Sequence, residues 1–219
     1  KLLDWFRANK GASTTRLAIN SNLGAEVDLD RLLASTQDVV LDIYTSNESM
    51  DLQAEYIRDG LNMFSWRYNM GRLMTAKKLR GLHVMCTINA LCLETLPDFL
   101  DLLVDWKKAF GRDFPNFSLN ILRFPSFQSV LVLPLEMRQH YADRLSQFLV
   151  KHKGYSYLHD HEIAQTQRLI KYLVESPVPA DQQKLAHDFH KFYQQYDRRR
   201  GKNFESTFGL PMTEWYRTL

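Results

Sequence analysis

Short runs of apolar residues alternate with longer helical patterns along the first part of the chain. Strands are predicted over residues 16–22, 38–46, 83–89 and 117–123, where β-branched and other apolar residues cluster. The segments between these strands repeat apolar residues at helical spacing, most clearly over 94–110. This order predicts right-handed strand–helix–strand crossovers and therefore a parallel sheet.

The pattern changes after Pro134, where three apolar stripes at helical spacing follow one another with a break at Pro177 and Pro179. We therefore expect an α/β protein. Residues 1–134 are expected to form a parallel sheet or partial (β/α) barrel of about four strands, and an α-helical extension is expected over 135–219. Other helices are predicted over 2–10 with Gly11 as its C-cap, 28–35, 51–60 and 62–78.

Polar residues follow each predicted strand. The four ends are Asn20-Ser21-Asn22, Tyr44-Thr45-Ser46, Thr87-Ile88-Asn89 and Arg123-Phe124-Pro125-Ser126. Parallel sheets bind ligands at the carboxyl ends of their strands, so these groups predict a site for a polar small molecule. The alternative is that they only face solvent.

Arg58 lies on the helix that follows the second strand. A guanidinium near a strand end can hold a carboxylate with two parallel hydrogen bonds. The other interpretation is a surface salt bridge to Glu55 or Asp59.

The amino-acid composition excludes few classes of function. Lys and Arg exceed Asp and Glu by only 28 to 25, and a net charge of +3 does not by itself indicate nucleic acid. Two cysteines, Cys86 and Cys92, provide no disulfide framework, so we expect reduced thiols and a cytoplasmic protein. No apolar run is long enough to predict a membrane span. Because Lys1 opens directly into a helical pattern, we expect the natural chain to begin earlier.

Two groups of side chains have other interpretations. The pairs His159/His161, with Glu162, and His187/His190 have spacings that could bind a metal, but they lack further ligands, and a solvated helix face is favoured.

A basic run near the end of the chain contains Arg198, Arg199, Arg200 and Lys202. This run could bind phosphate or nucleic acid, form a helix C-terminus, or dock the tail onto the barrel through carboxylates.

The order of these motifs resembles the third to sixth strand–helix units of the radical S-adenosylmethionine enzymes, which implies that residues 1–134 are the later half of a partial parallel (β/α) barrel. The similar segments are Ile19-Asn20-Ser21-Asn22-Leu23, Ser46 followed by Arg58, and Thr87-Ile88-Asn89. The chain most resembles a phage and environmental subgroup with a twitch-type C-terminal extension, whose members share three longer motifs. These motifs are Gln-Ala-Glu-Tyr-Ile-Arg-Asp-Gly (53–60), Arg-Phe-Pro-Ser-Phe-Gln-Ser (123–129) and Tyr-Asp-Arg-Arg-Arg-Gly-Lys-Asn-Phe (196–204).

The resemblance implies an iron–sulfur enzyme that cleaves S-adenosylmethionine to a radical, which abstracts hydrogen from a substrate. It places Asn20, Asn22, Ser46, Arg58 and Asn89 at the cofactor, with Arg123 and Ser126 toward an unknown substrate. The family's Cys-x3-Cys-x2-Cys loop and Gly-Gly-Glu segment are absent from this sequence. Three thiolates are needed to hold a 4Fe-4S cluster with one open iron, so we expect this chain to be an inactive fragment without the cluster ligands.

Two further hypotheses remain open from the sequence. One is a nucleic-acid or phosphate-binding module that uses the basic tail. The other is a non-catalytic interaction domain that uses Trp215, Tyr216 and the aromatic residues near them.

Overall fold

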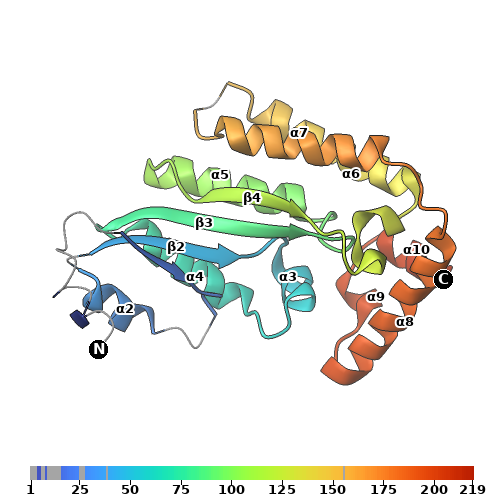
Figure 1. The fold of residues 1–219 in the computed structure, drawn as a ribbon, viewed down its shortest axis with the longest axis horizontal. Helices are drawn as coiled ribbons and strands as arrows, with labels where there is room; N and C mark the ends of the chain where they lie inside the picture. The colour runs from blue at the N-terminus through green and yellow to red at the C-terminus, as the bar shows by residue number, and fades with distance from the viewer. Residues whose placement is uncertain (1–3, 6–7, 9–15, 25–27, 38, 155) are drawn as a thin grey trace.

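The computed structural model describes residues 4–5, 8, 16–24, 28–37, 39–154 and 156–219, so most of the helix predicted over 2–10, and its Gly11 cap, lie outside the described residues. The fold is α/β, with one parallel sheet followed by a helical C-terminal region, as predicted (Figure 1). The strands lie in the order in which they occur along the chain: β1 (Arg16–Asn20), β2 (Val40–Ser46), β3 (Leu79–Ile88) and β4 (Asn116–Ile121).

All four predicted strands are confirmed, but β3 begins at Leu79 rather than at His83. The earlier start arises because Leu79 and Leu82 are in register with Leu41 and Ile43 of β2. The added residues include Gly81, although glycine weakens a strand interior. Here it is the partner of Asp42 in the sheet.

The helices begin and end close to their predicted bounds. Asp28 caps the first of them by accepting a hydrogen bond from the Arg31 N–H at 2.9 Å. Left-handed Gly111 and Gly201 end two others. The helices are α2 (Leu29–Ser35), α3 (Asp51–Ile57), α4 (Met63–Met74), α5 (Leu96–Phe110), α6 (Leu135–Lys151), α7 (Asp160–Glu175), α8 (Gln182–Arg200), α9 (Phe204–Thr207) and α10 (Met212–Arg217).

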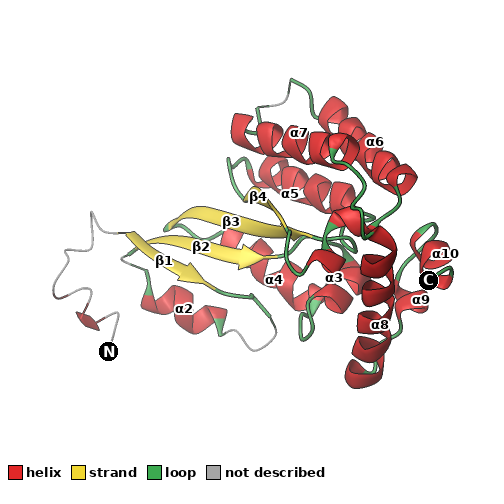
Figure 2. Ribbon diagram, turned by 45° about the vertical axis from the view of Figure 1, so that its right-hand side comes forward, coloured by secondary structure: helices red, strands yellow, loops and turns green. Residues whose placement is uncertain are grey.

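Helices α4 and α5 pack against one face of the sheet, and α8 to α10 lie at the end toward which the strands point (Figures 1 and 2). Trp66 of α4 is fully buried, with its ring 5.7 Å from that of Phe99 of α5. Its indole N–H donates to the Thr45 hydroxyl of β2 at 3.1 Å. Residues of β2 that alternate with Thr45 therefore point to the opposite face.

That opposite face is polar and more exposed. Strand register aligns Asn20, Tyr44, His83 and Asn116 in one row across the sheet. The Tyr44 and His83 rings stack at 4.5 Å. Burial lowers the pKa of His83, which favours the neutral imidazole. Polar side chains therefore continue from the strand ends onto this face of the sheet.

Side chains of α7 complete the hydrogen bonding of β4 along its outer edge. Glu162 accepts from the Phe117 N–H at 2.9 Å, and Gln165 accepts from the Leu119 N–H at 2.6 Å. Arg168 donates to the Leu119 carbonyl at 2.8 Å. Because an edge strand otherwise leaves backbone groups unpaired, these contacts terminate the sheet at β4.

Glu162 also forms a fully buried ion pair. The Lys107 ammonium lies 2.9 and 2.7 Å from its two carboxylate oxygens, and neither side chain has any exposed surface. The prediction that His159, His161 and Glu162 form a solvated helix face is therefore wrong for Glu162. The pair joins α5 to α7. It is tolerated in the interior because each charge compensates the other.

We expect Lys107→Met to lower the free energy of unfolding by about 3–5 kcal/mol, because it leaves the Glu162 carboxylate buried without its cation. Urea denaturation followed by circular dichroism measures this loss. Lys108→Met, at the more exposed neighbouring position on α5, serves as the control and should change stability by less than about 0.5 kcal/mol. A loss below about 1 kcal/mol in Lys107→Met would contradict the assigned role of the pair.

Candidate functional site

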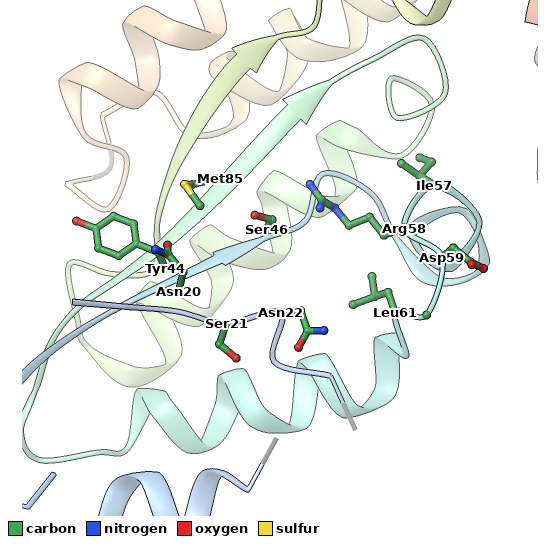
Figure 3. Close-up of a pocket in the computed structure, with 11 residues that line it drawn as sticks. Asn20, Ser21, Asn22, Tyr44, Ser46, Ile57, Arg58, Asp59, Leu61 and Met85 are labelled. Atoms are coloured by element: carbon green, nitrogen blue, oxygen red, sulfur yellow. The ribbon is translucent and has the colours of Figure 1, made fainter. Parts of the chain in front are cut away.

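A pocket of about 600 Å³ lies at the carboxyl ends of β1, β2 and β3, where the turn between α3 and α4 closes one side (Figure 3). Four of the five residues predicted at the cofactor line it: Asn20, Asn22, Ser46 and Arg58. The remaining lining residues are Ser21, Tyr44, Ile57, Asp59, Gly60, Leu61 and Met85. We call this cavity the rim pocket.

The loop after β1 is held by its own side chains. The Ser21 hydroxyl accepts from the Leu23 N–H, and the side-chain Oδ1 of Asn22 accepts from the Gly24 N–H, both at 3.1 Å. Asn69 of α4 donates to the Leu23 carbonyl at 3.1 Å and so fastens the loop to the core. The oxygen of the Asn22 amide is thus used within the loop, whereas no described residue accepts a hydrogen bond from its NH₂ group.

The turn after α3 brings Arg58 to the pocket. The Arg58 N–H closes the helix by donating to the Ala54 carbonyl at 2.9 Å. Gly60 follows with φ +84°, a left-handed conformation that residues with a Cβ adopt at a cost. The Arg58 guanidinium consequently points back toward Ser46 at the end of β2 (Figure 3).

Arg58 is paired with Glu48, which neither of the sequence interpretations anticipated. Its Nε and Nη2 donate to Glu48 Oε2 at 3.1 and 2.5 Å, and the Thr87 N–H donates to the same oxygen at 3.3 Å. The predicted surface bridge to Glu55 or Asp59 is therefore wrong. The Glu48 side chain is 2% exposed, and its burial raises the pKa of the carboxyl despite the opposing effect of Arg58.

The other predicted residues lie elsewhere. Asn89 lines a neighbouring cavity, and both ends of its amide stabilise its own loop, through the Leu91 N–H at 2.9 Å and the Thr87 carbonyl at 3.0 Å. Arg123 and Ser126 are exposed residues that follow β4 and do not line the rim pocket. The structure thus does not bring these three residues to the rim pocket.

The basic tail docks onto the rim, which is the third of the predicted alternatives. Arg200 and Lys202 lie 2.9 and 3.0 Å from the Asp59 carboxylate, and the hydrogen bond from Lys202 holds the pKa of Asp59 below its usual value. The Lys202 ammonium also donates to the Glu55 carbonyl at 2.6 Å, at the C-terminus of α3. Arg198 and Arg199 are exposed.

Aromatic residues reinforce this docking. The Tyr56 hydroxyl donates to Asp197 at 2.6 Å, and the Tyr196 hydroxyl donates to the Tyr56 carbonyl at 2.7 Å. Burial, together with Asp197, raises the pKa of Tyr56. Tyr216 is buried and stacks on Phe204 at 3.9 Å, and Trp215 packs on Phe189 at 5.1 Å. The aromatic tail therefore packs within this chain.

The cysteines do not fit an iron–sulfur cluster. Cys86 and Cys92 are fully buried, and burial raises the pKa of both thiols, which disfavours the thiolate that iron requires. Cys86 lies in β3 and packs within the apolar core. Within the described residues, no group of three His, Cys, Asp or Glu side chains is placed to hold a metal ion.

No helix in the described part of the chain is long and apolar enough to cross a bilayer. No protein-family model, curated protein or solved structure matches the chain.

We expect Lys202→Met to release the α8–α9 connection from the turn at 58–60, since the substitution removes charged hydrogen bonds to Asp59 and to the end of α3. The loss of stability should be about 1–3 kcal/mol. Hydrogen exchange of residues 57–61 measures the local effect, which should be an increased rate. Arg199→Met is the matched control, and similar exchange rates in the two variants would show that Lys202 does not hold this turn.

Proposed function

We propose that the rim pocket binds S-adenosylmethionine in a radical S-adenosylmethionine enzyme, of which this chain forms the later barrel strands. The observation that supports the proposal most is the convergence of Asn20, Asn22, Ser46 and Arg58 on one pocket. These residues come from three separate segments of the sequence. The resemblance of their motifs to that family implies the same positions for cofactor contacts.

The chemistry of the pocket suits the cofactor. Arg58 uses Nε and Nη2 for Glu48, and among the described residues nothing accepts a hydrogen bond from its Nη1. This N–H group, with the Ser46 hydroxyl beside it, would hold the methionyl carboxylate. The Asn20 and Asn22 amides would hold the ribose hydroxyls, because an amide NH₂ donates to a hydroxyl oxygen. A volume of about 600 Å³ lies in the range of small-molecule sites.

The bound cofactor supplies, in that family, a carbon radical that removes a hydrogen atom from a substrate. The reaction needs a cluster, and the two buried cysteines of this chain do not fit one. We therefore assign this chain binding and orientation only, and we expect the chain alone to be inactive. The substrate is not assigned.

A phosphate- or nucleic-acid-binding role for the tail has less support. Arg200 and Lys202 already contact Asp59, which leaves Arg198 and Arg199 as the exposed cations of the run that do not contact Asp59. Such binding would weaken steeply with added salt, in proportion to the number of phosphates contacted.

Arg58→Lys should weaken the binding of S-adenosylmethionine by about tenfold or more. Lysine keeps the charge near Glu48 but loses the planar set of N–H groups that can serve Glu48 and a second carboxylate together. Isothermal titration calorimetry on the chain measures the dissociation constant. Arg198→Lys, on the exposed tail, is the matched control and should leave it unchanged. Equal affinities in the two variants would remove Arg58 from the cofactor site.

The gene supplies an independent test. We expect the coding sequence upstream of Lys1 to encode three cysteines in the order Cys-x3-Cys-x2-Cys, because the strands described here lack them. Anaerobic reconstitution of the longer protein should then give the absorption of a 4Fe-4S cluster. An upstream sequence without these cysteines would refute the family assignment.

A further inference from the structure

A second cavity, of about 250 Å³, lies on the other side of the Glu48–Arg58 pair from the rim pocket. Arg58 and Ile57 line both cavities, whereas Glu48 lines only the second. Its other lining residues are Thr87, Asn89, Leu122, Gln128 and Tyr193. We call this cavity the Glu48 pocket. It lies where the ends of β3 and β4 meet α8.

The Glu48 carboxylate presents one unused oxygen at this pocket. Its Oε2 accepts from Arg58 Nε, Arg58 Nη2 and the Thr87 N–H. None of the described residues donates to Oε1, although the Glu48 side chain is only 2% exposed. Because Oε1 is not among the buried side-chain atoms that lack a partner, it is accessible from the pocket. A ligand that brings a donor to Oε1 would therefore form a hydrogen bond that no described residue supplies.

The remaining polar groups of the pocket also favour a ligand that donates hydrogen bonds. The Gln128 amide donates from Nε2 to the Tyr193 hydroxyl at 3.4 Å, which leaves its carbonyl oxygen as an acceptor. The Asn89 amide is used at both ends by its own loop. Arg58 directs two of its N–H groups at Oε2, so its charge is already paired. Ile57, Leu122 and the Tyr193 ring add apolar surface.

We propose that the Glu48 pocket binds a protonated alkylamine, with the ammonium on Glu48 Oε1 and its carbon chain against Ile57, Leu122 and Tyr193. An ammonium carries donors and no acceptor, which matches an unpaired carboxylate oxygen and an amide oxygen. The volume accommodates a small ligand or one end of a larger one. This inference does not rest on the cofactor proposed for the rim pocket, because none of its contacts involves that ligand.

The test compares two ligands of the same shape. Butylamine, protonated at pH 7, and 1-butanol are titrated into the full chain, and the amide signals of Thr87 and Asn89 are followed by ¹H–¹⁵N NMR. Butylamine should bind about tenfold more tightly than 1-butanol, because a charge-assisted hydrogen bond replaces a neutral one. Glu48→Gln should remove this difference.

Glu94→Gln is the matched control. Glu94 is a half-buried carboxylate whose pKa, like that of Glu48, is raised by burial, but it bonds to Gln53 and does not line the Glu48 pocket. This variant should keep the full preference for the amine.

Leu122→Trp keeps the Glu48–Arg58 pair and fills the cavity, so it should abolish binding of both ligands. If Glu48→Gln does not fold, this variant tests whether the ligands bind in the Glu48 pocket. Equal affinities for the two ligands, a preference for the amine that persists in Glu48→Gln, or undiminished binding to Leu122→Trp would each overturn the proposal.

Discussion

The last strand of a parallel sheet has backbone groups that no further strand satisfies, and in this protein α7 supplies the missing partners from its side chains. Glu162 is central to this arrangement because it accepts from both Phe117 and Lys107. The contact fixes the helical region beside β4, and the chain then returns over the strand ends as α8 (Figure 2). There Asp197 and Lys202 hold α3 and the turn that carries Arg58. The geometry of the rim therefore depends on an ion pair at the sheet edge.

Much of the fold follows from local patterns. Apolar, β-branched-rich runs predicted the four strands, and helical spacing of apolar residues predicted the helices that Asp28 and Gly111 cap in the structure. The rim pocket was predictable in outline for a related reason. Parallel strands place their carboxyl ends together, so polar residues such as Asn20 and Ser46, which follow β1 and β2, had to converge.

The contacts between distant charges were not predictable. Lys107 and Glu162 are 55 positions apart, and each sits in a helix whose other charges face solvent. Glu48 follows Ser46 closely, yet its pairing with Arg58 depends on the left-handed turn at Gly60, which a single glycine does not specify. The start of β3 at Leu79 was also not predicted, because the strand continues through Gly81. A Cβ there would lie 2.5 Å from an Asp42 oxygen, so the glycine serves packing within a strand.

The Glu48–Arg58 pair has a thermodynamic consequence for the two cavities that it separates. Arg58 faces both, and an anion that reaches its Nη1 from the rim pocket shares the positive charge of the guanidinium with Glu48. Such an anion makes the potential at Glu48 more negative and thereby strengthens the attraction of a cation there. Because linkage is reciprocal, a cation at Glu48 would strengthen the anion's binding by the same factor. One ion pair is thus sufficient to give positive heterotropic cooperativity without any movement of the sheet.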